Sequence, residues 1–282
     1  MDRTPRPNTS SSVQDVLLVK LGGSLITDKT RPESPRTEVI ERLAGEIARA
    51  AGPVGGLIAG RLIVGHGSGS FGHVAARRYG LAQGIRTADQ LPGVSLTQER
   101  AAALHRLVTG ALAAAGALPF SIAPSSCVVS AAGAPVALAD EPLRLALRQG
   151  LLPVVYGDVV TDRDWGVSIC STERMFDLLA RRLPANGLPV RRVLWLGETD
   201  GVWDDAGRTI PRISADTFTE AARAIGAPAG VDVTGGMLHR VETALGLARL
   251  GIPSLILNGL VPGALERALR GEEVEGTEVL VS

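Results

Sequence analysis

Glycine and histidine are concentrated in one ten-residue segment, Val64–His73, which reads VGHGSGSFGH. The short apolar run Arg61–Val64 before it predicts a buried strand, and Val74–Tyr79 after it predicts the start of a helix. A glycine-rich turn between a strand and a helix lets backbone N–H groups approach an anion, and the helix N-terminus adds a favourable dipole. The spacing differs from the Walker lysine loop and from the dinucleotide-binding GxGxxG pattern. The segment therefore predicts a phosphate-binding turn of another type.

A second glycine turn follows another apolar run. Lys20–Ser24 reads KLGGS at the end of Val16–Leu21, and a third glycine pair lies at Gly235 and Gly236. A lysine buried at a strand end is costly unless it meets an anion. Beside two glycines we favour a phosphate contact for Lys20 over a side chain that reaches solvent at the sheet edge. Several such turns in one chain predict a protein that holds more than one phosphate.

Lys29 and His73 have two interpretations each, whereas the other histidines have one. Lys29 lies in a polar loop, where a lone lysine is usually a solvated charge. His73 follows a glycine near a predicted helix start, where it could donate to a phosphate oxygen or simply cap and pack the helix. His66, His105 and His239 are interpreted as structural or surface residues.

Acidic residues and one arginine complete the candidate set. Glu198 and Asp200 belong to the turn Gly197–Trp203, which could bind ribose, a base or magnesium, or could be an ordinary Asp-Gly turn. Asp232–Met237 opens a predicted helix with Arg240 one turn in, a suitable place for a terminal phosphate. No Ser-His-Asp order, paired catalytic carboxylates or metal cluster is evident in the sequence. Phosphoryl transfer fits that absence, because it needs mostly positioning and charge neutralisation.

Composition limits the class of partner. The 282 residues include 29 Lys+Arg and 29 Asp+Glu, so a net charge of zero removes the electrostatic argument for nucleic acid or membrane surfaces as partners. No apolar stretch is long enough to predict a membrane span. Cys127 and Cys170 are far apart and form neither a disulfide framework nor a zinc motif, so we expect reduced thiols and a cytoplasmic protein. Residues 1–12 are polar and proline-containing, which predicts a disordered leader.

Strands and helices alternate along the chain. The predicted strands are Val16–Leu21, Leu62–Val64, Leu152–Tyr156, Arg192–Leu196, Ser254–Leu257 and Thr277–Val281. The predicted helices are Thr37–Ala51, Gln98–Ala115, Ala139–Gln149, Thr172–Leu183, Met237–Leu250 and Gly263–Leu269. Asp158–Ile169 predicts a hairpin, and the seam near it divides the chain into two lobes. The alternation predicts an α/β three-layer sandwich with a mainly parallel central sheet, whose strand ends gather the glycine and acidic turns at one edge.

The motifs resemble the amino acid kinase superfamily, and within it the isopentenyl phosphate kinases, from about Val16 to Val281. The matching segments, in the family's order, are Lys20–Ser24, Thr27–Lys29, His66–His73, Pro124–Ser126, Pro153–Asp158, Thr199–Val202, Asp232–Met237, Asn258-Gly259 and Glu275–Thr277. Lys-x-Gly-Gly-Ser occurs across the superfamily. Phe-Gly-His, here Phe71–His73, is narrower and is shared with fosfomycin kinases.

The resemblance implies a role for each matching residue. Those implied around ATP are Lys20, Gly22, Gly23, Ser24, Gly69, Asp200, Gly235 and Arg240. Those implied at the acceptor phosphate are Ser68, Gly69, His73, Gly157 and Asp158. The groups implied in catalysis are Lys20, Lys29, which would stabilise the transferring phosphoryl group, and His73. No residue is implied as a dedicated metal ligand.

Three positions depart from the family's pattern. Ser68 stands where glycine is frequent, and Arg240 replaces a lysine that usually reaches the ATP phosphates. Ser171–Arg174 reads STER where the family often has SGDD, which leaves metal and nucleotide contacts open there. Glu173 is the substitute that we expect for the missing acid.

The resemblance implies a single kinase domain over 13–282, with an acceptor lobe at about 13–165 and a nucleotide lobe at about 166–282. It implies ATP and Mg²⁺ as cofactors, isopentenyl phosphate as the acceptor and isopentenyl diphosphate as the product. It also implies a homodimer with no nucleic-acid or membrane partner. Helices between Leu91 and Ala115 are candidates to hold the prenyl tail. A kinase for fosfomycin or another phosphonate and a catalytically silent nucleotide-binding regulator remain the alternatives.

Overall fold

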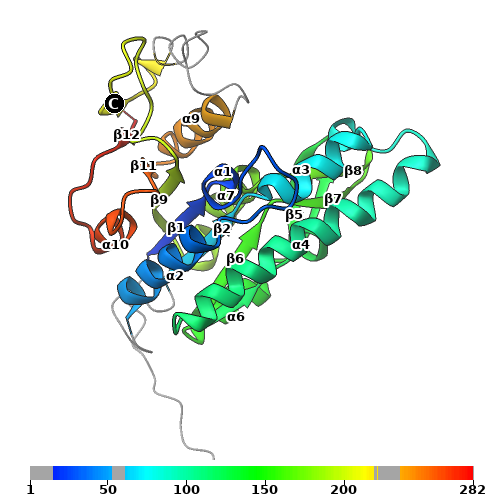
Figure 1. Cartoon of the computed structure of the whole chain (residues 1–282), viewed down its shortest axis with the longest axis horizontal. Coiled ribbons are helices and arrows are strands. Elements are labelled where there is room, and N and C mark those ends of the chain that lie inside the picture. The colour runs from blue at the N-terminus through cyan, green and yellow to red at the C-terminus, as the bar shows by residue number, and fades with distance from the viewer. Residues whose placement is uncertain (1–14, 53–60, 219–220, 222–235, 282) are drawn as a thin grey trace, which may run out of the picture.

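An eight-stranded sheet forms the centre of the computed structural model (Figure 1), which describes residues 15–52, 61–218, 221 and 236–281. Its strand order is β10-β12-β11-β9-β1-β2-β6-β3. The strands are β1 (Val16–Leu21), β2 (Leu62–His66), β3 (Pro119–Ser121), β6 (Leu152–Tyr156), β9 (Val190–Gly197), β10 (Arg212–Ile213), β11 (Ser254–Asn258) and β12 (Thr277–Val279). Of the neighbouring pairs, only β11 and β12 run antiparallel. The predicted leader and Gly235 lie outside the described residues.

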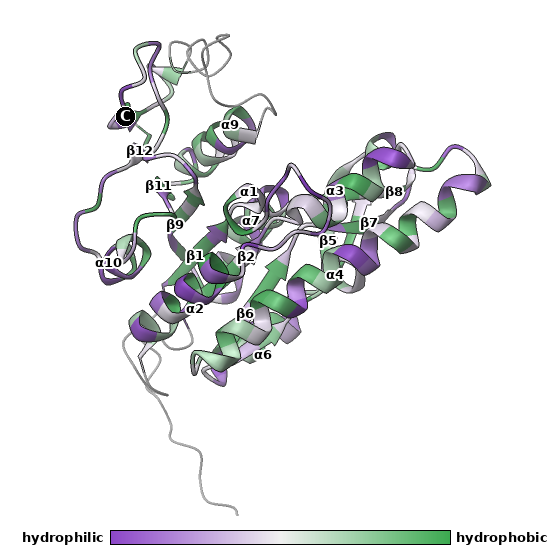
Figure 2. Ribbon diagram, in the orientation of Figure 1, coloured by the Kyte–Doolittle hydropathy of each residue, from purple (hydrophilic) through white to green (hydrophobic). Residues whose placement is uncertain are grey.

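Helices cover both faces of this sheet. One layer holds α2 (Thr37–Ala51), α4 (Leu91–Ala114) and α10 (Ala264–Arg270), and the other holds α6 (Glu141–Arg148), α7 (Thr172–Arg182) and α9 (Gly236–Ala248). Successive side chains of a strand face opposite sides, so Leu18 joins the core beneath α7 and α9 while Val19 joins the core beneath α2 and α4. Figure 2 shows a hydropathy pattern that agrees with this burial: the ribbons of β1 and β6 are mostly hydrophobic, whereas hydrophobic and hydrophilic residues alternate along α2 and α4. The predicted three-layer sandwich is confirmed.

A second, four-stranded sheet has the order β5-β4-β7-β8. The predicted hairpin is present as β7 (Asp158–Asp162) and β8 (Gly166–Cys170). A second hairpin, β4 (Val128–Ala131) with β5 (Ala134–Leu138), was not predicted. Asp162 links the two turns, since its carboxylate accepts N–H bonds from Ala132, Gly133, Asp164 and Trp165.

The bounds of several elements agree with the sequence and others differ. β1, α2 and β6 have the predicted limits, while α4 begins at Leu91 rather than Gln98. α3 (Gly69–Arg78) begins within the glycine segment and not at Val74. Its first turn is held from outside, because Ser70 N–H donates to Thr27 Oγ1 at 2.9 Å and Phe71 is buried. His73 therefore lies on the helix itself.

The remaining elements are short. They are α1 (Gly23–Ile26), α5 (Pro124–Cys127), and the 3₁₀ turns η1 (Leu81–Gln83), η2 (Ala88–Gln90) and η3 (Pro184–Asn186). Both cysteines are free thiols; Cys170 is buried and Cys127 is half-buried. Among the described residues, no helix has the length and apolar character needed to cross a membrane.

Candidate functional site

Four adjacent strands end at one edge of the sheet, and each is followed by a turn that the sequence singled out. β9, β1, β2 and β6 are neighbours and run parallel, so their carboxyl ends lie together. Glu198–Asp200 follows β9, Gly22-Gly23 follows β1, Gly67–Gly69 follows β2 and Gly157 follows β6. The predicted gathering of these turns at one edge is confirmed.

The first two glycine turns are in direct backbone contact. A Cβ added to Gly23 would lie 2.8 Å from Gly69 N, and one added to Gly67 would lie 2.9 Å from Gly23 N. Gly69 also has φ +49°, and a Cβ there would collide with Thr27 Oγ1. No side chain fits between the two turns, so glycine is required for their backbones to form a single surface.

Lys20 and Glu173 form a buried ion pair beside this surface. Lys20 Nζ lies 2.7 Å from Glu173 Oε1, and both side chains are almost fully buried. Lys20 faces the layer of α7 and α9, where Glu173 occupies the first turn of α7. Arg240 of α9 is buried close by, and a Cβ on Gly197 would lie 2.8 Å from its Nη1.

Burial and charge act in opposite directions on this pair. Burial lowers the pKa of Lys20, and the carboxylate of Glu173 counters that effect. Burial of Glu173 by itself opposes ionisation, but the ammonium group of Lys20 outweighs it and holds the pKa of Glu173 at about 2. At neutral pH the carboxylate of Glu173 is therefore ionised, and it holds the Lys20 side chain in place beside the glycine turns.

The loop that carries Lys29 is held by hydrogen bonds within it and by others to α3. Asp28 N–H donates to Ser34 O at 2.8 Å, and Ser34 N–H donates to Ser70 Oγ at 3.2 Å. Lys29 itself is exposed, and its charge lowers the pKa of both Lys20 and His73. The predicted polar loop is present, and its lysine lies close enough to both groups to influence their titration.

His73 directs one ring nitrogen to the backbone. Its Nδ1 lies 2.9 Å from Gly69 O and 3.2 Å from Ser68 Oγ. Because a carbonyl only accepts, Nδ1 carries the proton in the neutral ring, and Nε2 is left to face a ligand. Partial desolvation, together with the charge of Lys29, lowers the pKa of His73.

Gly157 and Asp158 lie against the glycine turn from the side of β6. Gly157 N–H donates to His66 O at 3.0 Å, and a Cβ on Gly157 would lie 3.6 Å from Ser68 N. Asp158 is buried and accepts N–H bonds from Ser125 and Val159. Burial raises the pKa of its carboxyl.

The acidic turn after β9 carries Asp200, which accepts a 2.9 Å hydrogen bond from Asn258 Nδ2 at the end of β11. Glu198 pairs with Arg36 at 2.6 Å. Ser24 follows the glycine pair within α1. Gly235 lies outside the described residues, as do residues 232–234 of its motif.

Two polar partners at this site were missed by sequence reasoning. Thr172 Oγ1 donates to His66 O at 2.7 Å, and Thr27 Oγ1 accepts from Ser70 N–H. Thr27 lies in a matching segment and Thr172 in a departing one, but neither contact could be predicted, since each partner lies far away along the chain. The substitute acid was anticipated at Glu173, but its pairing with Lys20 was not.

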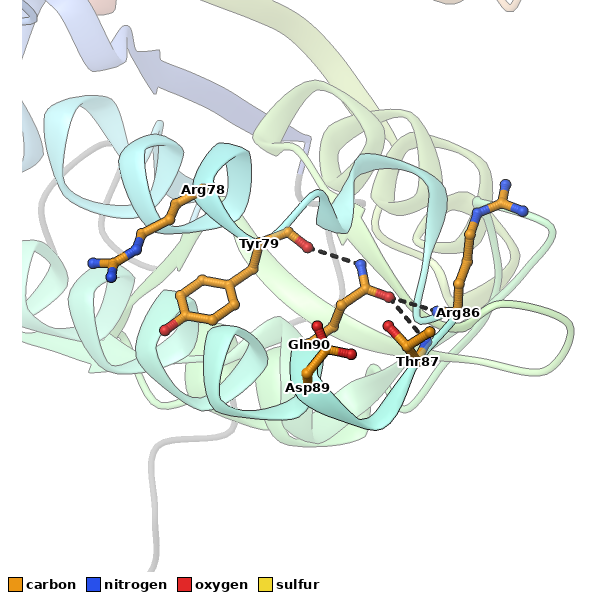
Figure 3. Close-up of a pocket in the computed structure, with 6 residues that line it drawn as sticks. All are labelled: Arg78, Tyr79, Arg86, Thr87, Asp89 and Gln90. Atoms are coloured by element: carbon orange, nitrogen blue, oxygen red, sulfur yellow. Dashed lines mark hydrogen bonds between the residues drawn. The ribbon is translucent and has the colours of Figure 1, made fainter.

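A pocket of about 610 Å³ opens elsewhere, at the far end of α3 (Figure 3). Its lining residues are Arg78, Tyr79, Arg86, Thr87, Asp89 and Gln90. Gln90 accepts from the backbone N–H groups of Arg86 and Thr87 and donates to Tyr79 O. None of the residues proposed for phosphate lines this pocket. Its polar lining does not suit a prenyl tail.

An α/β sandwich whose glycine turns meet beside a buried lysine defines a class of phosphate-handling proteins. The model of the amino acid kinase family matches residues 15–258, and the chain belongs to that family. Isopentenyl phosphate kinase of Methanothermobacter thermautotrophicus is 35% identical over 94% of this chain and 98% of its own length. That of Methanocaldococcus jannaschii is 29% identical over 93% and 97%. A crystal structure of an isopentenyl phosphate kinase, 32% identical, superposes with a TM-score of 0.78 over 94% of this chain and 99% of its own.

Proposed function

We propose that the chain transfers the γ-phosphoryl group of ATP to isopentenyl phosphate, forming isopentenyl diphosphate and ADP. The observation that carries the proposal is the backbone contact between the two glycine turns beside the Lys20–Glu173 pair. Two turns that each offer N–H groups to an anion, in contact with one another, suit a donor and an acceptor phosphate that must react. The similarity to isopentenyl phosphate kinases along the whole chain supports that choice of acceptor.

In the proposed reaction an oxygen of the acceptor phosphate attacks the γ-phosphorus, and the bond from phosphorus to the β–γ bridging oxygen breaks. The acceptor is already ionised, so no strong general base is needed. Lys20 and Arg240 would neutralise the charge of the donor phosphates, and Lys29 would stabilise the negative charge on the transferring phosphoryl group. Ser68 and Gly69 N–H with His73 Nε2 would hold the acceptor. Asp158 would line the acceptor side.

ATP would lie along Gly22, Gly23 and Ser24 towards Asp200. These residues suit a phosphate, because the buried Lys20 precedes the glycine pair and because a Cβ on Gly22 or Gly23 would collide with the backbone, at 2.7 Å from Leu196 O or 2.8 Å from Gly69 N. Among the described residues no group of three or more acidic, histidine or cysteine side chains is arranged to hold a metal ion. Mg²⁺ would accordingly be bound chiefly through the ATP phosphates. Glu173, in its ion pair with Lys20, would maintain the charge balance that the family's aspartate would otherwise supply.

We assign residues 13–165 to an acceptor lobe and 166–282 to a nucleotide lobe, in a cytoplasmic homodimer. The edge strand β3 supports the dimer, since it ends the large sheet and exposes Phe120 beside the exposed Leu118. Phe120→Lys should shift the sedimentation coefficient to that of a monomer. An unchanged coefficient, or a monomeric wild type, would reject this interface.

The proposed activity is tested by ADP release with isopentenyl phosphate, dimethylallyl phosphate, fosfomycin or no acceptor. We expect the highest kcat/KM with isopentenyl phosphate and only background release without an acceptor. Much faster turnover of fosfomycin would indicate a phosphonate kinase. Nucleotide binding with no acceptor-dependent ADP would indicate a regulator.

A matched pair of variants tests the acceptor site. His73→Ala should lower kcat/KM for the acceptor by about 10- to 100-fold, the effect of one charge-assisted hydrogen bond, and leave the KM for ATP unchanged. Val74→Ala changes the next residue, whose side chain is exposed, and should match wild type. An equal response of the two variants would remove His73 from the site.

A further inference from the structure

Three aromatic side chains form a buried stack beneath the glycine turn. His66 ends β2, His105 lies on α4 and Tyr156 ends β6. The ring centroids of His105 and Tyr156 are 4.3 Å apart, and those of His66 and His105 are 5.3 Å apart. All three residues are buried. The stack lies outside the set of residues that would contact the phosphates.

A chain of hydrogen bonds runs through the two histidines. His66 Nδ1 lies 3.1 Å from Gly67 O, and His66 Nε2 lies 3.0 Å from His105 Nδ1. His105 Nε2 then lies 2.9 Å from Ser121 Oγ on the exposed edge strand β3. The chain thus connects the glycine turn to the outer edge of the sheet.

Chemistry fixes the direction of every bond in this chain. Gly67 O can only accept, so His66 Nδ1 must carry the proton. Burial lowers the pKa of His66 to about 3 and that of His105 to about 4, so both rings are neutral at pH 7. His66 Nε2 is then an acceptor, His105 Nδ1 must donate to it, and Ser121 Oγ must donate to His105 Nε2. A single pair of tautomers satisfies all three contacts.

The hydrogen bond between His66 Nδ1 and Gly67 O holds the peptide plane between Gly67 and Ser68 in place. Gly67 O belongs to the peptide bond that also carries Ser68 N–H, and the described residues include no cis peptide bond. In a trans peptide the N–H points opposite to the C=O. Holding Gly67 O against His66 therefore turns Ser68 N–H away from the His66 ring. Gly157 lies near this amide, since a Cβ on Gly157 would be 3.6 Å from Ser68 N. Without that restraint, glycine at position 67 would permit the plane to rotate.

We propose that His105 is a positioning residue for the acceptor phosphate: by donating to His66 it fixes the Gly67–Ser68 peptide plane and so aims Ser68 N–H at the ligand. The proposal rests on the proposed function only in naming that ligand as a phosphate. Packing alone is the competing role for a stack of three rings, and two experiments separate it from positioning.

The first test needs no activity. Long-range ¹H–¹⁵N NMR spectra of the wild-type protein at pH 7 report the tautomer of each histidine. We expect neutral Nδ1–H tautomers for both His66 and His105, with His239 of α9 as the internal reference. An Nε2–H tautomer at His66 would overturn the proposal, because Gly67 O would then have no donor from that ring.

The second test uses two variants with opposite properties. His105→Phe keeps an aromatic ring but no donor, whereas His105→Asn loses the ring but keeps an N–H close to the position of Nδ1. If the donor matters, His105→Phe raises the KM for isopentenyl phosphate about tenfold, the equivalent of one weakened hydrogen bond to a charged group. His105→Asn then stays within about threefold of wild type, and the KM for ATP changes in neither.

The reverse order, with His105→Asn impaired and His105→Phe normal, would show that the stack only packs and would overturn the proposal. If isopentenyl phosphate proves not to be the acceptor, the dissociation constant of inorganic pyrophosphate, measured by calorimetry, replaces KM in the same comparison. Failure of the proposed function is then seen in the acceptor panel alone. If His105→Phe does not fold, the wild-type tautomers decide.

Discussion

The buried pair of Lys20 and Glu173 makes a quantitative prediction about stability. The pKa of Glu173 is held at about 2, against an ordinary value of 4.5. Each pH unit between the folded and unfolded pKa corresponds to about 1.4 kcal/mol, so the ionised carboxylate contributes about 3 kcal/mol at pH 7. Loss of one partner from a buried pair typically costs about 3–5 kcal/mol, which agrees. Glu173→Gln keeps the shape and removes the charge, and should lower the free energy of unfolding by that amount.

The sign of the pH dependence follows from the lowered pKa. A carboxyl that is more acidic in the folded state stabilises the protein above its unfolded pKa, and the contribution disappears as the pH falls through the folded value. The difference between wild type and Glu173→Gln should be constant above about pH 5 and fall to about half by pH 3. Urea unfolding at pH 7, 5 and 3 measures it. Glu99→Gln, at an exposed carboxylate paired with Arg100, is the control and should stay within about 0.5 kcal/mol of wild type. A difference below about 1 kcal/mol at pH 7, or one that does not shrink at pH 3, would show that the ionised Glu173 carboxylate does not stabilise the fold.

Three further predictions concern Lys29, His73 and Gly69. Lys29→Ala should lower kcat about 100-fold or more with little change in either KM, because Lys29 stabilises charge that develops only in the transition state. Arg31→Ala removes an exposed cation of the same loop and should leave kcat within a factor of two, so equal kcat values in the two variants would show that Lys29 does not act in catalysis. The pKa of His73 is lowered in the free protein and a bound phosphate favours the charged ring, so acceptor binding at pH 7.5 should be accompanied by proton uptake, which calorimetry in buffers of different ionisation enthalpy detects. His73→Gln should abolish this uptake, and an identical buffer dependence in the two proteins would show that His73 is not the group that gains the proton. Gly69→Ala should lower the free energy of unfolding by about 2 kcal/mol or more, because Gly69 has a positive φ and a Cβ there would collide with Thr27. Gly110→Ala, in open space on α4, should be neutral or stabilising by up to about 1 kcal/mol, and a neutral Gly69→Ala would show that the two turns can separate.

The elements of the large sheet were predictable because their signal is local. Val16–Leu21 and Leu152–Tyr156 are short apolar runs bounded by glycine or polar turns, and both have the predicted limits. The layers followed from alternation of strands and helices. The start of α3 was not predictable, because glycine and serine disfavour a helix and only contacts such as Thr27 with Ser70 hold its first turn. The hairpin of β4 and β5 did have a local signal, the turn at Ala132-Gly133 between alternating residues, which the sequence reading overlooked.

The candidate site divides in the same way. Its glycine turns could be found because each directly follows a strand, and a parallel sheet brings strand ends to one edge. The partners that tune the site could not be found, since Lys20 and Glu173 lie on different elements far apart in the sequence. The contact of His66 with His105 depends likewise on how α4 crosses β2. Residue types were therefore predictable at the strand ends, while the ion pairs and tautomers that set their chemistry required the packed structure.

In the proposed reaction, donor and acceptor phosphates meet where the two glycine turns touch. A crystal structure of the protein with a non-hydrolysable ATP analogue and isopentenyl phosphate tests it most directly. We expect the terminal phosphate of the analogue against Gly23 and Lys20, and the acceptor phosphate between Ser68 N–H, Gly69 N–H and His73 Nε2. Phosphate groups bound apart from these turns, for example in the pocket between Arg78 and Gln90, would contradict it.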